Sequence, residues 1–221
     1  MLFLAVFCGF LAENIREHSV ERHREKEYII SMIKDLATDT VNINTHFIYR
    51  KDRRRRLDSL SLLLRQPFTN TGLIYYYARW GVRNTFFNSN DRTIQQLKNA
   101  GGLRLIRNQA SSDAIMDYDA RLKIVNTQSY LLEGETVNQY YRMMNKIFDG
   151  NVLDEMYMDS LIIKPVGDPP LLTNNKEVIA EFISLLHFVK SLNNRNNFFE
   201  QKLKIQAVNT IQILKKEYHL K

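Results

Sequence analysis

Glycine, proline and cysteine are scarce in this chain of 221 residues, which contains 8 glycines, 4 prolines and 1 cysteine. Because tight turns and strand ends use glycine and proline, their scarcity predicts long, uninterrupted secondary-structure elements. A single cysteine, Cys8, excludes an internal disulfide framework and a metal site built from several cysteines. Cys8 lies in an apolar stretch, where a thiol behaves as a small hydrophobic side chain. We therefore do not expect it to act as a nucleophile.

Sequence signatures of common enzymes are lacking as well. The chain contains no glycine-rich phosphate-binding loop, no G-x-S-x-G motif and no HExxH motif. None of the 5 histidines has another histidine three or four residues away, so a helical two-histidine metal face is excluded. These absences predict a non-enzymatic protein that needs no metal or other cofactor.

Positive charge is in excess, with a formal net charge of +7, but the signs are mixed along most of the chain. We do not expect a nucleic-acid partner from this total alone. The exception is the run at residues 50–56, where four consecutive arginines cover about 300° of a helix circumference. It is either a solvated helix face with one snorkelling side chain or a patch that binds an anion, an acidic partner or nucleic acid. The candidate patch consists of Arg50, Lys51, Arg53, Arg54, Arg55 and Arg56.

The first twelve residues, MLFLAVFCGFLA, carry no charge. A membrane-spanning helix needs about 20 apolar residues, whereas twelve cover only about 18 Å. A secretory signal peptide would show a positive leading region and a small-residue cleavage site, and neither is present; a buried core helix is the other alternative. We expect residues 1–12 to be a membrane-anchoring helix that contacts lipid, and to be the exit end of a longer helix.

Residues 13–27 alternate acidic and basic side chains with almost no apolar stripe, which is typical of a solvated helix. We interpret this segment as a stalk. From there to about residue 66 apolar residues recur at helical spacing, which predicts one long helix, with an interruption near residues 38–45 left open. Pro67 ends it. Further helices are expected at 71–80, from the cap at residues 89–91 to Gly101, and from Ser111 or Ser112 to about residue 148.

Residues 68–87 are rich in aromatic side chains. Three adjacent tyrosines on a helix cannot share one face, which favours packing in a core or interface. As an alternative, the zone could line a small-molecule pocket between helices. The candidate pocket residues are Tyr75, Tyr76, Trp80 and Phe86.

The C-terminal region begins with a loop at residues 161–173, which holds three of the four prolines. Asn174 or Asn175 is expected to cap a last helix whose apolar residues step by three and four over about 40 residues, a coiled-coil-like seam. Asn196 falls on this seam. The helix either continues with one polar layer or breaks into a hairpin near residues 193–197, and the absence of glycine and proline favours continuity.

Two stretches of the chain are FLAVFCGFLAENIREHSVERHREKEYIISMIKDL and, at residues 90–119, NDRTIQQLKNAGGLRLIRNQASSDAIMDYD. Both resemble a family of uncharacterised single-pass membrane proteins of Gram-negative bacteria. Together they cover about a third of the chain and are patterns of packing and turns. The resemblance implies one transmembrane helix in the bacterial inner membrane and a helical domain in the periplasm. The basic tail that precedes the apolar helix in that family is missing here.

The sequence therefore predicts an all-α fold, a bundle of long antiparallel helices with an N-terminal membrane-anchoring helix and a charged stalk. Residues 1–12 form the anchor, 13–27 the stalk and 28–221 the bundle domain. The function we expect is that of a membrane-anchored interaction or scaffold protein, which binds a protein partner or a second copy of itself. The alternative is a sensor-like bundle that binds a small molecule in the aromatic zone.

Overall fold

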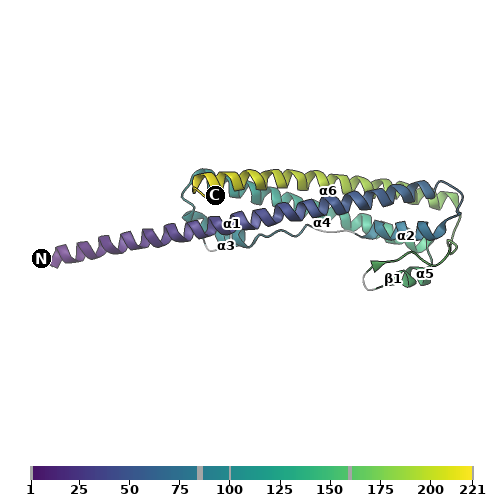
Figure 1. Ribbon diagram of the computed structural model, residues 1–221, viewed down its shortest axis with the longest axis horizontal. Coiled ribbons are helices and arrows are strands. Elements are labelled where there is room, and N and C mark those ends of the chain that lie inside the picture. The colour runs from purple at the N-terminus through teal and green to yellow at the C-terminus, as the bar shows by residue number, and fades with distance from the viewer. Residues whose placement is uncertain (1, 84–86, 100, 159–160, 221) are drawn as a thin grey trace. The chain divides into compact units, whose positions relative to one another are not determined.

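The computed structural model describes residues 2–83, 87–99, 101–158 and 161–220, and the side chains of all of these except 2, 4, 5 and 128–133. These parts of the chain are predominantly helical, which confirms the all-α prediction (Figure 1). In chain order the helices are α1 (Leu2–Leu63), α2 (Thr71–Val82), α3 (Arg92–Asn99), the 3-10 helix η1 (Gly102–Leu105), α4 (Gln109–Ile147), α5 (Gly150–Glu155) and α6 (Lys176–Glu217). Strands β1 (Tyr157–Met158) and β2 (Leu161–Ile162) form a short antiparallel pair.

The chain divides into two compact units, and α1, α4 and α6 each contribute residues to both. Unit 1 comprises Met1–Ile43, Asn88–Lys123 and Lys202–Lys221, and unit 2 comprises Asn44–Phe87 and Ile124–Gln201. The two long helices whose continuity the sequence left open are both unbroken. Helix α1 runs through residues 38–45, and α6 runs through residues 193–197. Continuity of the last helix is thus confirmed.

Helix α6 runs antiparallel to α1 within unit 2. Lys190 of α6 donates to Asp58 of α1 over 2.9 Å, whereas Glu200, further along α6, pairs with Arg50, two turns earlier on α1. The core of this unit is formed by apolar residues of α1, α2, α4 and α6. It includes Leu57, Leu60, Ile74, Tyr75, Tyr140, Met144, Phe148, Phe182 and Leu186. Apolar positions spaced by three and four therefore face inward, as the sequence pattern predicts.

Unit 1 holds α3 against α1 through two buried carboxylates. Asp35 accepts hydrogen bonds from the backbone N and Oγ1 of Thr93, at 3.2 and 2.6 Å. Asp39 accepts from the backbone N of Asn90 and from the hydroxyl of Tyr118 on α4. The first N–H groups of a helix have no partner inside the helix. Carboxylates from α1 supply partners at the start of α3, and burial next to Asp39 raises the pKa of Tyr118.

The ends of the helices differ in detail from those expected. Asn108, and neither Ser111 nor Ser112, caps α4, because its Oδ1 accepts from the backbone N of Ser111 at 2.9 Å. Asn175 caps α6 by accepting from the backbone N of Glu177, which selects one of the two candidates. The segment expected to be all loop at residues 161–173 begins with strand β2. Two residues are too short for an alternating pattern to be detected in a sequence.

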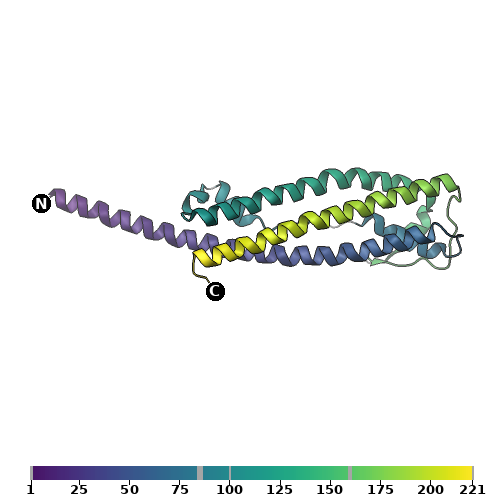
Figure 2. The same ribbon diagram turned by 90° about the horizontal axis from the view of Figure 1, so that it is seen from above.

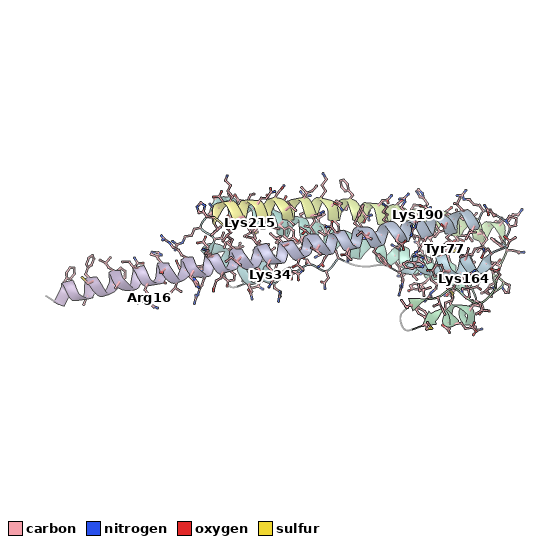
Figure 3. All side chains as sticks on the ribbon, viewed as in Figure 1. Arg16, Lys34, Tyr77, Lys164, Lys190 and Lys215 are labelled. Carbon is pink, nitrogen blue, oxygen red and sulfur yellow. The ribbon has the colours of Figure 1, made fainter. Side chains whose placement is uncertain are left out.

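The N-terminal part of α1 extends past the C-terminal end of α6 in unit 1 (Figure 1, Figure 2). Side chains in this part, including Arg16, stand clear of the neighbouring helices (Figure 3). Contacts with the rest of the unit reach back to His18 and Glu21, which both contact Arg107. Glu25 is buried and accepts from Tyr218. Packing thus begins inside the segment expected to be stalk. Among the described residues, no helix has a stretch long and apolar enough to cross a lipid bilayer.

Truncation of Phe182 should destabilise unit 2. Its ring is fully buried and contacts the rings of Tyr140 and Phe148. We expect Phe182→Ala to lower the free energy of unfolding by about 3–5 kcal/mol, because it removes buried apolar area and leaves a cavity. Urea denaturation followed by circular dichroism measures this. Phe198→Ala, at an exposed position of the same helix, is the control, and equal losses in the two variants would contradict the packing described here.

Candidate functional site

Arg53 joins three helices of unit 2. Its side chain is buried, and its Nε and Nη2 donate to the carbonyl oxygens of Trp80 and Gly81 at 3.0 and 2.6 Å. Both carbonyls lie in the last turn of α2, where they have no intrahelical partner and form the negative end of the helix dipole. Nη1 of Arg53 also donates to Oδ1 of Asn193 on α6, at 3.4 Å. Arg53 therefore caps α2 and connects it to both long helices.

Arg50 is buried one turn earlier on α1. Its guanidinium lies 2.7 Å from a carboxylate oxygen of Glu200 on α6, and both side chains are at most 2% exposed. The amide of Asn193 donates to the Arg50 carbonyl at 2.9 Å, and Nδ1 of His46 lies 3.7 Å from Glu200. Removing one partner of a buried ion pair typically costs about 3–5 kcal/mol. The Arg50 side chain therefore lies inside unit 2, where its contacts are with other residues of the unit.

Arg56 lies between an acidic group and an aromatic face. Its guanidinium stacks over the ring of Trp80 at 4.1 Å from the ring centre, and Nη1 donates to the hydroxyl of Tyr76 at 2.8 Å. Its Nε donates to Asp52 at 2.7 Å, and Asp52 also accepts from Arg55. The hydrogen bond from Arg56 is the main reason that the pKa of Asp52 lies below its usual range. Stacking and hydrogen bonding hold this guanidinium in one orientation.

The six residues of the predicted basic patch therefore do not share one surface. Lys51 and Arg55 are exposed, and Arg54 is half-buried with its Nε 3.7 Å from Asp58. Arg50 and Arg53 point into the core, which removes them from any surface patch. One arginine of a consecutive run must face the helix on which it packs. In the run at residues 53–56 this is Arg53, and Arg50, three residues earlier, lies on the same side of α1.

The polar partners of these arginines on α6 were missed from the sequence, apart from the polar layer at Asn196. Asn193, Asn196 and Glu200 are all buried. They follow one another at spacings of three and four, so they lie on the face of α6 that otherwise carries the apolar seam. These three residues interrupt the apolar seam of α6 with polar side chains. Such an interruption, together with basic residues on another helix, is the sequence signal that could have predicted them.

The aromatic residues do not line a common pocket. Tyr75 points into the core, where its hydroxyl donates to the Pro170 carbonyl at 3.0 Å and accepts from the Asp149 backbone N. Burial raises the pKa of Tyr75. Tyr76 and Trp80 instead contact Arg56. The remaining member of the predicted set, Phe86, lies outside the described residues. Where they are described, the candidate pocket residues are therefore divided between the core and the contact with Arg56.

Side chains of the metal-binding types are also scattered. Within the described part of the chain, no group of three or more histidine, cysteine, aspartate or glutamate residues is placed to hold a metal ion. The charged groups around Arg50 and Arg53 bind one another and backbone carbonyls. Their arrangement is one that fixes helices in place, and its chemistry is that of hydrogen bonds and ion pairs.

Comparisons of the chain with models of protein families, with curated protein sequences and with solved structures find no match. The likeness to a family of Gram-negative membrane proteins stays a prediction from the two sequence stretches that carry it.

Replacing Asp52 should change how stability depends on pH. Its pKa is lower in the folded chain than in the unfolded chain, so the ionised carboxylate stabilises the fold above a pH of about 4. That contribution is lost as the pH falls through the lowered pKa. We expect the wild type to lose more stability than Asp52→Asn between pH of about 6 and 2.5, in urea titrations.

The control for this comparison is Asp117→Asn, which removes an exposed carboxylate from α4. It should leave the pH dependence of the wild type nearly unchanged. If Asp52→Asn and the wild type lose the same stability on acidification, the ion pair with Arg56 does not stabilise the folded chain.

Proposed function

We propose that this chain is a membrane-anchored, non-enzymatic scaffold or interaction protein, with residues 1–12 as its contact with lipid. The observation that carries the proposal is a row of large apolar side chains on the projecting start of α1. Phe3 is 82% exposed and Phe10 69%, and Val6, Phe7, Leu11 and Ile15 are exposed as well. Each such side chain gains about 1.5–3 kcal/mol when it is moved completely out of water. A helix with this surface favours an apolar environment over solvent.

The polar segment that follows supports an exit from the membrane near Glu13. Glu13 and Arg16 form an ion pair one turn apart at the surface of the helix. Charged side chains of this kind are costly inside a bilayer and are stable at its surface. Residues 13–17 therefore suit the role of a spacer between lipid and unit 1, since the contacts with Arg107 begin at His18, whose Nδ1 lies 3.2 Å from Nη2 of the arginine.

The interaction role is supported by apolar side chains that remain exposed on the long helices. The buried charged groups of the bundle bind other parts of the same chain, as Arg53 and Glu200 show. Large apolar side chains are nevertheless exposed along the long helices, among them Ile48, Leu62 and Phe198. Exposed apolar helix faces commonly contact other proteins. We propose that a protein partner or a second copy of the chain covers them.

Substitution of three phenylalanines should release the chain from lipid. In the variant with Phe3→Asp, Phe7→Asp and Phe10→Asp, three carboxylates replace the exposed rings. We expect wild-type protein to sediment with phospholipid vesicles and the variant to remain in the supernatant, with at least a tenfold lower bound fraction, because charges resist transfer into lipid.

The matched control carries Ile48→Asp, Leu62→Asp and Phe198→Asp, three exposed apolar positions elsewhere on the long helices. It should sediment like the wild type. Equal release of both triple variants would show that vesicle binding follows net charge, and binding of the Phe3, Phe7 and Phe10 variant at the wild-type level would refute the anchor.

The resemblance noted above leads us to propose the bacterial inner membrane, with the helical domain in the periplasm. An Asn209→Cys, Cys8→Ser variant carries one exposed thiol in the helical domain. We expect a membrane-impermeant thiol reagent to label it in intact spheroplasts, and protection until the membrane is opened would place the domain on the other side.

Chemical crosslinking in native membranes tests the scaffold role. We expect crosslinks that join the exposed faces of the long helices to one reproducible partner, or to the same residues of a second copy. Mass spectrometry identifies the joined peptides. Recovery of crosslinks only within single chains, under conditions in which a known membrane complex is captured, would contradict the proposal.

A further inference from the structure

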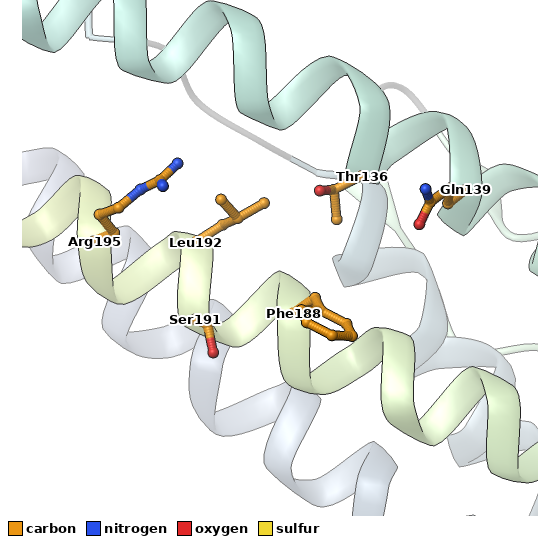
Figure 4. A pocket seen from close by; sticks show the side chains of 6 residues that line it. All are labelled: Thr136, Gln139, Phe188, Ser191, Leu192 and Arg195. Carbon is orange, nitrogen blue, oxygen red and sulfur yellow. The ribbon is translucent and has the colours of Figure 1, made fainter.

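A groove lies between α4 and α6 in unit 2, with a volume of about 410 Å³ (Figure 4). This volume is within the range of about 300–1,000 Å³ that is typical of small-molecule sites. Its described lining residues are Thr136, Gln139, Phe188, Ser191, Leu192 and Arg195.

Arg195 supplies charge at one end of this groove. Its guanidinium and the side chain of Leu192 point from α6 towards α4 (Figure 4). The Nε and Nη2 atoms of Arg195 are buried and have no hydrogen-bond partner. Buried hydrogen-bond donors are nearly always bonded. Two unbonded donors on one guanidinium therefore indicate that an acceptor from outside the chain binds there. A carboxylate fits, because its two oxygens match two adjacent N–H groups of a guanidinium.

Apolar and polar side chains share the rest of the groove: Leu192 and Phe188 are apolar, and Thr136, Gln139 and Ser191 are polar. Leu192 and Phe188 lie three and seven residues before Arg195 on α6, which places them along one face over about 10 Å. Phe188 is 61% exposed, so its ring offers apolar surface to a ligand in the groove. A second hollow of about 480 Å³ shares Gln139 and Phe188 with the first and continues to Leu185. The apolar side chains of Leu192, Phe188 and Leu185 thus follow one another along α6 away from the unpartnered cation, beside polar lining residues.

We propose that this groove binds a free long-chain carboxylate. The head group pairs with the Arg195 guanidinium, and the hydrocarbon chain covers Leu192 and Phe188 and extends towards Leu185. Burying the chain removes these side chains from water. No described residue of the segment 1–12 lines the site. The proposed ligand site and the proposed membrane anchor can therefore be tested independently.

Charge along the groove favours an anion over a cation. Arg142 and Lys146 line the second hollow, and the one acidic residue among its described lining, Glu181, lies 3.7 Å from Lys146. The remaining positive charge repels a cationic head group and attracts a negative one.

Calorimetric titration of the full chain with sodium dodecanoate, kept below its micelle concentration, tests the proposal. We expect Arg195→Gln to weaken binding by about 10- to 100-fold, the usual loss for hydrogen bonds to a charged group. Arg195→Lys keeps the charge but loses the planar fork, so its affinity should fall between the two. Arg24→Gln removes an exposed arginine from α1 and should bind like the wild type.

Further binding and labelling experiments locate the binding site and distinguish a free carboxylate from a membrane lipid as the ligand. Dodecyltrimethylammonium should bind at least ten times more weakly than dodecanoate, and the Phe3, Phe7 and Phe10 variant should keep its dodecanoate affinity. A photoreactive dodecanoate should label the segment of α6 around Phe188. Equal affinity of Arg195→Gln and wild type, labelling confined to residues 2–12, or binding only to anionic phospholipid vesicles would each overturn the proposal.

Discussion

The burial of the Arg53 guanidinium is the constraint on which unit 2 depends. A cation can leave water only if its donors are satisfied, and here the acceptors come from two other helices: the last-turn carbonyls of α2 and the amide of Asn193 on α6. Gly81 makes this possible from α2, because a Cβ there would lie 2.0 Å from the ring of Tyr140. The position of α2 against the long helices follows from these contacts.

Unit 1 also buries ionisable side chains of α1, but here they are acidic. Asp35 and Asp39 on α1 bind the chain at the start of α3, and Glu25 accepts from the backbone N of Arg107 and from Tyr218. In both units short connecting segments are fixed by buried ionisable groups of α1. Breaking such contacts would leave buried charge without compensation, which is more costly than losing an exposed ion pair. Polar contacts of this kind select one arrangement among many that bury similar apolar area.

Much of the fold could be predicted from periodicity. The breaks at Pro67, at Gly101 and before Gly150 fall where the helices end, and the inward positions of α6 follow the apolar seam. The candidate site was harder to predict. Arg50 and Arg53 carry the same sequence signal as Arg54 and Arg55, yet they are buried and the others are not. Which face of α1 meets α6 depends on the pairing of residues more than 130 positions apart, and no local pattern contains that information.

The sequence by itself determined the helical class, the length of the elements and the apolar character of residues 1–12, because these depend on local propensity and on spacing along one helix. Tertiary structure alone decided that the basic run is divided between core and surface, that Tyr75 is separated from Tyr76 and Trp80, and that Arg195 faces a groove without a partner. The reason is physical. Spacing fixes which side chains share a helix face, whereas burial of a charge depends on acceptors that a distant helix brings to it.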